Sequence, residues 1–268
     1  MNILSLNTWY GKRFDELREF VISRSKETDV FCLQEMLFGG PREYVAGGKA
    51  RGSLYEELAA VLPDFQALHA VSPSTSSFIE ELRAVNAQGN GLAIFIRKTI
   101  TILESGSLSL YDGDPFALTA SRAGAGTGLM LWAHVQDAQG KRYTIATLHG
   151  LFLDLRLPSP AKRDTPERIE QSRRIVDFIK KQQYPCIVVG DLNLRPETKS
   201  IAMLSEVMRN LISEYGITNT RNYEYELMEE FKDYIADYAF VSKEITLREF
   251  KVLPDVVSDH SPLLLECS

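Results

Sequence analysis

The sequence predicts an α/β fold of four layers (α/β/β/α), in which two mixed β-sheets pack face to face and helices cover their outer faces. The chain begins with the order strand, helix, strand, and its middle part (about 91 to 148) holds one strand-like run after another without helices. Adjacent strands pair as hairpins, whereas helix-linked strands lie side by side. No linker rich in Gly, Ser or Pro divides the chain, so we expect a single domain over residues 1–268.

The predicted strands are short apolar runs with many β-branched residues. In chain order they are Ile3–Leu6, Val30–Leu33, Phe65–Val71, Leu92–Ile96, Ile100–Leu103, Leu129–Val135, Tyr143–Thr147, Cys186–Val189, Tyr234–Val241, Leu247–Val252 and Pro262–Leu265. The predicted helices are Asp15–Ser25, Leu54–Val61, Pro166–Lys181 and Lys199–Arg209. The third helix has the clearest signals, because Thr165 can serve as its N-cap and Pro166 suits its first turn.

The composition is that of a folded globular protein. Hydrophobic residues make up 44% of the chain, and 30 Lys and Arg stand against 36 Asp and Glu, for a net charge of −6. These proportions exclude a disordered or collagen-like chain, and no apolar run is long enough to span a membrane. A pI near 5.4 argues against a protein that coats nucleic acid through bulk positive charge, although a local basic patch could still bind phosphate.

The cysteines and the N-terminal residues indicate the compartment. Cys32, Cys186 and Cys267 lack the spacing of a metal site, and we expect reduced, mostly buried thiols. The sequence starts in a strand-like run without a secretory leader, and it contains no lipidation motif or amphipathic membrane helix. We therefore expect a cytoplasmic protein without a stable membrane anchor. We also expect a monomer.

Polar residues stand at or just past the last apolar position of several predicted strands, where ligand-binding groups gather in α/β proteins. This holds for Asn7, Glu35, His149, Asp191 and Asn193, whereas Asp237 stands inside an apolar strand and Asp259 and His260 come just before the last strand. Taken singly, each has a plain structural explanation as a turn residue, a solvated side chain or part of an ion pair. The other two histidines, His69 and His134, lie within apolar strand patterns, and we interpret both as structural.

The combination of these residues points to chemistry. Asp191 and Asn193 are two apart on an extended backbone, so both can face one ligand. Asp237 lies inside an apolar strand and needs a partner, and it could hold one ring nitrogen of His260 while the other accepts a proton from water. The alternative is an ion pair that fastens the C-terminal strand. Hard oxygen ligands, an oriented histidine and phosphate donors together fit metal-assisted phosphate ester hydrolysis, whereas no Cys or His cluster suits zinc.

The motifs resemble those of the endonuclease/exonuclease/phosphatase superfamily, which has the deoxyribonuclease I-like fold. They are Leu6–Trp9, Leu33–Glu35, Leu148–His149, Gly190–Asn193, Asp237–Tyr238 and Ser258–His260, and they follow the family's order from residue 7 to residue 260. The resemblance implies that Glu35 is the principal Mg²⁺ ligand, with Asn7 and Asp259 nearby in the metal shell. Mn²⁺ or Ca²⁺ could occupy the same ligands.

The resemblance also implies roles in the reaction. His260 is similar to the family's general base, oriented by Asp237, and Asp191 would help to position the attacking water. Asn193 and His149 would contact the scissile phosphate, and His149 is also a candidate proton donor to the leaving oxygen. Apurinic endonucleases of the superfamily usually place a tyrosine where this chain has a histidine. The sequence is therefore more similar to the deoxyribonuclease, sphingomyelinase and tyrosyl-DNA phosphodiesterase branches.

The loops give a first indication of the substrate. Residues 39–53 carry a net charge of +2 and residues 150–164 a net charge of +1, whereas residues 220–237 carry −4. Mildly positive loops suit a polyanion, so we expect a Mg²⁺-dependent phosphoesterase that cleaves a phosphodiester in DNA or RNA. A phospholipid, sphingomyelin or inositol phosphate is the alternative, since Phe38 and Leu151–Leu153 could line an apolar path or simply pack in loops. A binding module without activity is the third hypothesis.

Overall fold

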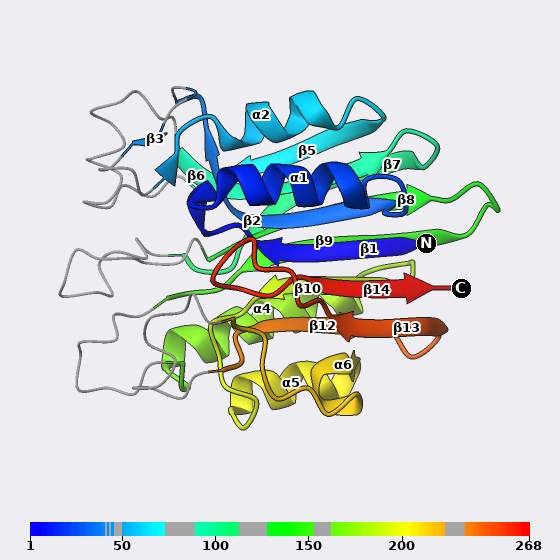
Figure 1. Ribbon diagram of the computed structural model, residues 1–268. Coiled ribbons are helices and arrows are strands. Elements are labelled where there is room, and N and C mark those ends of the chain that lie inside the picture. The colour runs from blue at the N-terminus through cyan, green and yellow to red at the C-terminus, as the bar shows by residue number, and fades with distance from the viewer. Residues whose placement is uncertain are drawn as a thin grey trace.

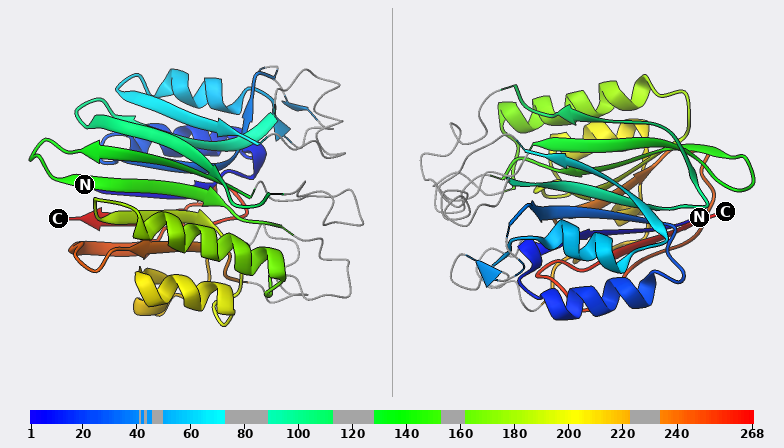
Figure 2. Two further views of the ribbon diagram at one scale, coloured as in Figure 1. Left: turned by 180° about the vertical axis from the view of Figure 1, so that it is seen from behind. Right: turned by 90° about the horizontal axis from the view of Figure 1, so that it is seen from above.

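Two six-stranded sheets lie face to face at the centre of the protein, with helices outside both of them (Figure 1). The computed structural model describes residues 1–40, 42, 44–45, 50–72, 89–112, 128–152, 162–222 and 234–268. Seen from above in Figure 2, α4 lies on one outer side and α1 and α2 lie on the other, with the sheets between them. The predicted four-layer α/β sandwich is therefore confirmed.

The first sheet combines both ends of the chain. Its strands in spatial order are β13 (Leu247–Val252), β14 (Leu263–Cys267), β1 (Asn2–Asn7), β2 (Val30–Phe38), β6 (Gly89–Arg97) and β5 (Phe65–Val71). The strands β1 and β2 are parallel because α1 (Phe14–Arg24) connects them, and the other pairs are antiparallel. The carboxyl ends of β1 and β2 thus meet at one edge, opposite the two termini (Figure 1).

The second sheet repeats this plan with a different helix. Its strands in spatial order are β11 (Arg209–Asn210), β12 (Asp237–Val241), β10 (Cys186–Asp191), β9 (Arg142–His149), β8 (Leu129–Gln136) and β7 (Thr101–Ser109). The helix α4 (Pro166–Lys180) connects the parallel strands β9 and β10, so their carboxyl ends also meet. The remaining elements are η1 (Trp9–Gly11), α2 (Leu54–Val61), α5 (Lys199–Val207), α6 (Leu211–Glu214) and the short pair β3 (Tyr44–Val45) and β4 (Ala50–Arg51).

Apolar side chains alternate along the central strands, and this alternation builds two layers of core. In β1 and β2, Ile3 and Cys32 belong to the core shared with the second sheet, whereas Leu4 and Phe31 pack with Leu17 of α1. The first sheet's β2 and β6 contact β9, and β6 also contacts β8. Because side chains point to alternate faces of a strand, one set packs toward the second sheet and the other toward α1.

Most predicted elements occur within a few residues of their expected bounds. The predicted strands Phe65–Val71 and Leu247–Val252 and the helix Leu54–Val61 match as predicted, and Thr165 caps α4 by accepting a hydrogen bond from the backbone N–H of Arg168. The strand predicted to end at Leu33 continues to Phe38, and the strand expected from Tyr234 begins at Asp237. All three cysteines are free and buried. Among the described residues, no helix is both long and apolar enough to cross a membrane.

Candidate active site

All eight residues predicted from the strand ends lie in one cluster between the two sheets. The contacts that join them are Asn7 Nδ2 to Asp191 Oδ2 (3.1 Å), Asn193 N to Asp191 Oδ1 (2.8 Å), His149 Nε2 to Glu35 Oε1 and to Asp191 Oδ2 (3.7 Å each), and His260 Nε2 to Asp191 Oδ2 (3.6 Å) and to Asp259 Oδ1 (3.8 Å), with His260 Nδ1 beside Asp237. The sequence alone could not show this proximity, because the residues come from six separate segments.

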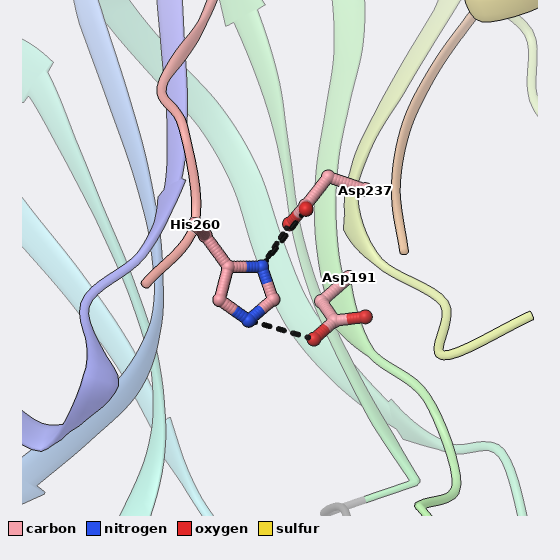
Figure 3. Close-up of side chains that lie close together, drawn as sticks. All are labelled: Asp191, Asp237 and His260. Atoms are coloured by element: carbon pink, nitrogen blue, oxygen red, sulfur yellow. Dashed lines mark hydrogen bonds and ion pairs between the residues drawn. The ribbon is translucent and has the colours of Figure 1, made fainter. Parts of the chain in front are cut away.

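His260 is held between two aspartates (Figure 3). Its Nδ1 lies 2.9 and 2.8 Å from the two carboxylate oxygens of Asp237, and Thr220 Oγ1 donates a hydrogen bond of 2.9 Å to the same carboxylate. Burial, assisted by the Arg221 guanidinium, lowers the pKa of His260 to about 3, so the ring is neutral near pH 7. Because Nδ1 donates to Asp237, Nε2 carries the lone pair and lies on the side of Asp191.

A β-bulge and two glycines set the backbone conformation around several of these side chains. Glu35 lies at a β-bulge between β2 and β6 with φ of 55°, and a bulge redirects the side chain that it carries. Gly190 has φ of 137°, and a Cβ there would lie 2.2 Å from the Leu148 carbonyl oxygen. A Cβ on Gly150 would lie 2.5 Å from the Leu192 carbonyl oxygen, so β9 and β10 can leave the sheet this close together only with glycine at both positions.

Glu35 shows that the cluster suits a cation. Its Oε2 is buried and has no hydrogen-bond partner among the described residues. Burial and the neighbouring carboxylates of Asp259 and Asp191 raise the pKa of Glu35 to about 8. A divalent ion bound to these oxygens would relieve both effects, and oxygen ligands are those that Mg²⁺, Mn²⁺ and Ca²⁺ prefer. Asn7 accepts a hydrogen bond from Trp9 N at 3.0 Å, which orients its amide between Asp191 and Glu35.

A second group of possible ligands consists of Asp191, Asp237 and His260, whose ligand atoms lie within 4.8 Å of one another. Two of these residues, Asp237 and His260, already form a hydrogen-bonded pair, since His260 Nδ1 contacts both carboxylate oxygens of Asp237. An ion there would have to break that pair. The Glu35 side of the cluster, where the described residues leave a carboxylate oxygen without a donor, would suit an ion better.

The cluster also contains buried hydrogen-bond donors. The buried amide nitrogen Nδ2 of Asn193 has no hydrogen-bond partner in the described part of the chain. Burial lowers the pKa of His149, so its ring is neutral near pH 7 and suits a hydrogen-bond donor better than a proton donor to a leaving group. The residues Arg168 and Gln171 of α4 bind the backbone of Leu151 and thereby fix the turn after His149.

The sequence analysis missed three residues of the site. Arg221 Nη1 lies 3.0 Å from Asp259 Oδ2 and also contacts His260 Nε2. Lys162 is buried and close enough to Asp237 and His260 to act on the pKa of both. Tyr10 follows β1, and burial together with nearby carboxylates raises its phenol pKa. Arg221 and Lys162 were missed because the sequence analysis considered only the net charge of the segment that contains each of them.

The remaining predictions concern residues outside the cluster. His134 is buried with Nε2 at 2.9 Å from Gln182 Oε1, whereas His69 is exposed and packs against the rings of Phe38 and Tyr55. Both lie outside the cluster, as expected. Phe38 is itself buried and packs in the core with Leu54 and Leu58 of α2, so among the described residues it is a core side chain. Leu151 is buried as well, and Leu153 lies outside the described residues.

Comparisons with known proteins identify a family for this chain. A protein-family model described as the endonuclease/exonuclease/phosphatase family matches residues 2–260. The chain belongs to this family. Members of the endonuclease/exonuclease/phosphatase family are hydrolases of phosphoester bonds. A sequence search of curated proteins finds no match to the chain.

Solved structures of the same family have the same fold. A family protein from Bacteroides thetaiotaomicron is 17% identical with a TM-score of 0.70, over 100% of this chain and 97% of that one. A mannosyl-6-phosphatase from the same organism is 17% identical with a TM-score of 0.68, over 100% and 99%. The human nocturnin catalytic domain with a bound sulfate anion is 17% identical with a TM-score of 0.64, over 100% and 93%. At these identities the likeness establishes the fold.

Proposed function

We propose that this protein is a divalent-cation-dependent phosphoesterase that cleaves a phosphodiester in nucleic acid with a water molecule activated by His260. The observation that carries the proposal is the buried pair of His260 and Asp237, with Asp191 3.6 Å from the outer ring nitrogen. A water molecule beside this gap can contact both His260 Nε2 and Asp191 Oδ2. An imidazole lone pair and a carboxylate at one water are what general-base hydrolysis requires.

The proposed reaction assigns each side chain a task. His260 Nε2 takes the proton of the water, and the Asp237 carboxylate holds Nδ1 and stabilises the imidazolium that results. The amide of Asn193 and the ring of His149 donate hydrogen bonds to the phosphoryl oxygens. Glu35 and Asp259, with Asn7 beside them, would hold the cation. When bound, a divalent ion neutralises charge on the phosphoryl group and stabilises the leaving oxygen.

Two observations bear on the substrate. The loops 39–53 and 150–164, which lie partly outside the described residues, carry net charges of +2 and +1 and favour a polyanion such as DNA or RNA. The likeness in fold to a mannosyl-6-phosphatase makes a sugar phosphate the second candidate. A cytoplasmic location and a monomeric state remain predictions of the sequence.

The test is hydrolysis with Mg²⁺ at one enzyme concentration. The substrates are single- and double-stranded DNA, RNA, a 5′-tyrosyl DNA end, sphingomyelin, inositol phosphates and mannose 6-phosphate. The variant His260→Asn removes the base, and His69→Asn is its matched control, because His69 is an exposed histidine on β5 outside the cluster. A parallel reaction contains EDTA.

The expected result is cleavage of a nucleic acid that EDTA and His260→Asn both abolish and that His69→Asn leaves unchanged. Cleavage of only a lipid or sugar phosphate, with the same dependence, would keep the assigned residues and replace the substrate. Full activity of His260→Asn would overturn the proposed base. Absence of turnover on every substrate would favour a binding module on this fold.

A further inference from the structure

Arg221 lies against Nε2 of His260, the ring nitrogen that would act as the base. Its side chain is almost entirely buried, with 6% of the residue exposed. The nitrogen Nη1 lies 3.0 Å from Asp259 Oδ2, and the same nitrogen contacts His260 Nε2. Because Nδ1 of the ring faces Asp237, Nε2 is the atom that accepts this hydrogen bond. The lone pair assigned to proton transfer is therefore covered by a guanidinium.

The backbone fixes Arg221 at this position. Residues 220–222 pair with residues 258–261, through an antiparallel bridge between Arg221 and His260. Ser261 N donates to the Thr220 carbonyl oxygen at 2.9 Å, and Asn222 N donates to the Asp259 carbonyl oxygen at 3.2 Å. Since Thr220 also binds the carboxylate of Asp237, one short segment orients the aspartate and supplies the cation. The contact of Arg221 with His260 thus belongs to the framework of the site.

The contact conflicts with the assigned chemistry unless Arg221 moves. A guanidinium cannot be deprotonated in a protein, so His260 Nε2 cannot take a proton from water while an N–H of Arg221 points at it. We propose that Arg221 is a phosphate-binding residue whose guanidinium turns from His260 to the scissile phosphate, so that a bound phosphoryl group uncovers the base. This inference rests on the proposed function for the role of His260, but the binding of phosphate by Arg221 can be tested without turnover.

The chemistry of the groups favours this exchange. A phosphate is an anion with several strong acceptor oxygens, whereas the neutral imidazole offers Arg221 one lone pair. The guanidinium has five N–H donors in a rigid fork, so it can keep its ion pair with Asp259 while other donors turn to the phosphate. The proposed phosphate donors Asn193 and His149 join the cluster through the same carboxylate, Asp191, that lies beside His260 Nε2. Arg221 also lies near enough to His149 for its charge to act on the pKa of that ring, so it belongs to the same cluster as the proposed phosphate donors.

A purely structural ion pair between Arg221 and Asp259 is the competing explanation. It would make Arg221 necessary for folding but irrelevant to phosphate affinity. The two are separated by inorganic phosphate binding to the Mg²⁺-loaded full chain, measured by isothermal titration calorimetry. The variants are Arg221→Gln, which removes the charge, and Arg221→Lys, which keeps it without the fork. Arg24→Gln is the control, because it removes a partly buried arginine paired with Asp255 away from the cluster.

We expect Arg221→Gln to weaken phosphate binding by about tenfold to a hundredfold, the range for a charge-assisted hydrogen bond, and Arg221→Lys to weaken it less. Arg24→Gln should bind like the original protein. If Arg221→Gln fails to fold, Arg221→Lys alone decides, since the loss of the fork should still weaken binding measurably. Equal phosphate affinity in the original protein and in the folded Arg221 variants would overturn the inference, as would the absence of phosphate binding to the original protein.

The uncovering of the base has its own readout. The chain has only four histidines, so ¹⁵N-histidine labelling can resolve the Nε2 resonance of His260. Phosphate should shift this resonance in the original protein, as the hydrogen bond from Arg221 is lost, and should leave it nearly unchanged in Arg221→Gln. A protein that binds phosphate through Arg221 but hydrolyses no ester would retain the inference and refute the proposed function. Hydrolysis with KM and kcat unaltered in Arg221→Gln would retain the proposed function and refute the inference about Arg221.

Discussion

The two sheets contribute different chemistry to the same cluster. From the first sheet and the turn before β14 come the candidate cation ligands Asn7, Glu35 and Asp259, and from the second come His149, Asp191, Asn193 and Asp237. In the second group, Asp191 accepts a hydrogen bond from Asn193 N, while the buried side-chain nitrogen Nδ2 of Asn193 has no partner in the described residues. In the first group, Glu35 keeps a buried oxygen without a donor in the described residues and a pKa raised to about 8. The first group thus leaves a carboxylate oxygen open, which suits a cation, and the second leaves an amide N–H open, which suits an anion.

His260 links these halves. It precedes β14 of the first sheet, but its ring is bound to Asp237 on β12 of the second. The base can therefore be oriented only if the two sheets are packed in the correct register. This arrangement predicts that variants of the second-sheet residues should impair catalysis without loss of cation binding, and that variants of the first-sheet residues should impair cation binding.

The largest effect is expected for Asp237→Asn. An amide cannot stabilise the imidazolium that forms on His260, and its N–H₂ can favour the wrong tautomer of the ring. We expect kcat on a substrate that the original protein cleaves to fall by about 10²–10⁴, the contribution of general-base catalysis. Mg²⁺ affinity, measured by calorimetry, should change by less than about tenfold, or 1.4 kcal/mol, because Asp237 is not one of the proposed cation ligands.

Asn193→Asp serves as a comparison on the same sheet. It places a negative charge where the site expects a phosphate donor, so it should raise KM, whereas Asp237→Asn should act on kcat. If Asp237→Asn instead abolished Mg²⁺ binding and left kcat of the loaded enzyme intact, the division between the two sheets would be wrong.

The second prediction concerns the stability of the ion-free protein against pH. In the folded protein the pKa of Glu35 is raised from 4.5 to about 8. As pH rises from 4.5 to 8, the unfolded chain releases this proton and the folded protein retains it, so folding stability should fall over this window. Glu35→Gln removes the effect. We expect the variant to have the same Tm as the original protein near pH 4.5 and a Tm several degrees higher at pH 8 in EDTA, at about 2–4 °C per kcal/mol.

Added Mg²⁺ should reverse this order. The ion favours the ionised carboxylate, so it should raise the Tm of the original protein at pH 8 and raise that of Glu35→Gln much less. Glu56→Gln is a suitable control, since Glu56 lies on α2 outside the cluster and binds Gly39 N. A Tm of the original protein that is flat from pH 4.5 to 8 in EDTA, or equally sensitive to Mg²⁺ in both proteins, would contradict the assignment of Glu35.

Much of the fold could be predicted from the sequence because strands buried on two faces are apolar without interruption. The edge strands β5 and β13 are partly exposed and include polar residues, whereas the start of β10 at Cys186 follows from such a run. The end of β2 does not, because Gln34 and Glu35 interrupt the apolar pattern while the bulge at Glu35 lets the strand continue to Phe38. The two-residue strands β3, β4 and β11 lack any periodic pattern of their own and depend on tertiary contacts.

The site could be predicted where its residues stand in motifs and could not where they act alone. Asp191 and Asn193 are recognisable because a glycine and an apolar strand precede them. Arg221 belongs to a segment with a net charge of −4, and only the pairing of residues 220–222 with 258–261 shows that its charge is buried against Asp259. A net charge averages over solvated residues, whereas a single buried cation determines the local field.

The smallest effect is expected for Gln34→Leu, which tests the packing between the sheets. Gln34 is fully buried, and its Nε2 donates a hydrogen bond of 2.7 Å to Thr147 Oγ1. Gln34 immediately precedes Glu35 in the first sheet, and Thr147 stands two residues before His149 in the second. Leucine fills a similar volume but leaves the Thr147 hydroxyl without this donor. We expect a loss of about 1–3 kcal/mol in the free energy of unfolding, measured in urea, because a buried polar group loses its partner.

The double variant Gln34→Leu with Thr147→Val shows whether this bond couples the sheets or merely satisfies two polar groups. If it couples them, the two losses should add to more than the loss in the double variant, with an interaction of about 0.5–3 kcal/mol. Because apolar contacts between β2 and β9 remain, kcat should fall by less than tenfold in the folded protein, far below the effect of Asp237→Asn. A loss of kcat as large as that of Asp237→Asn would mean that this one bond, and not the apolar core, holds the two halves of the site in register.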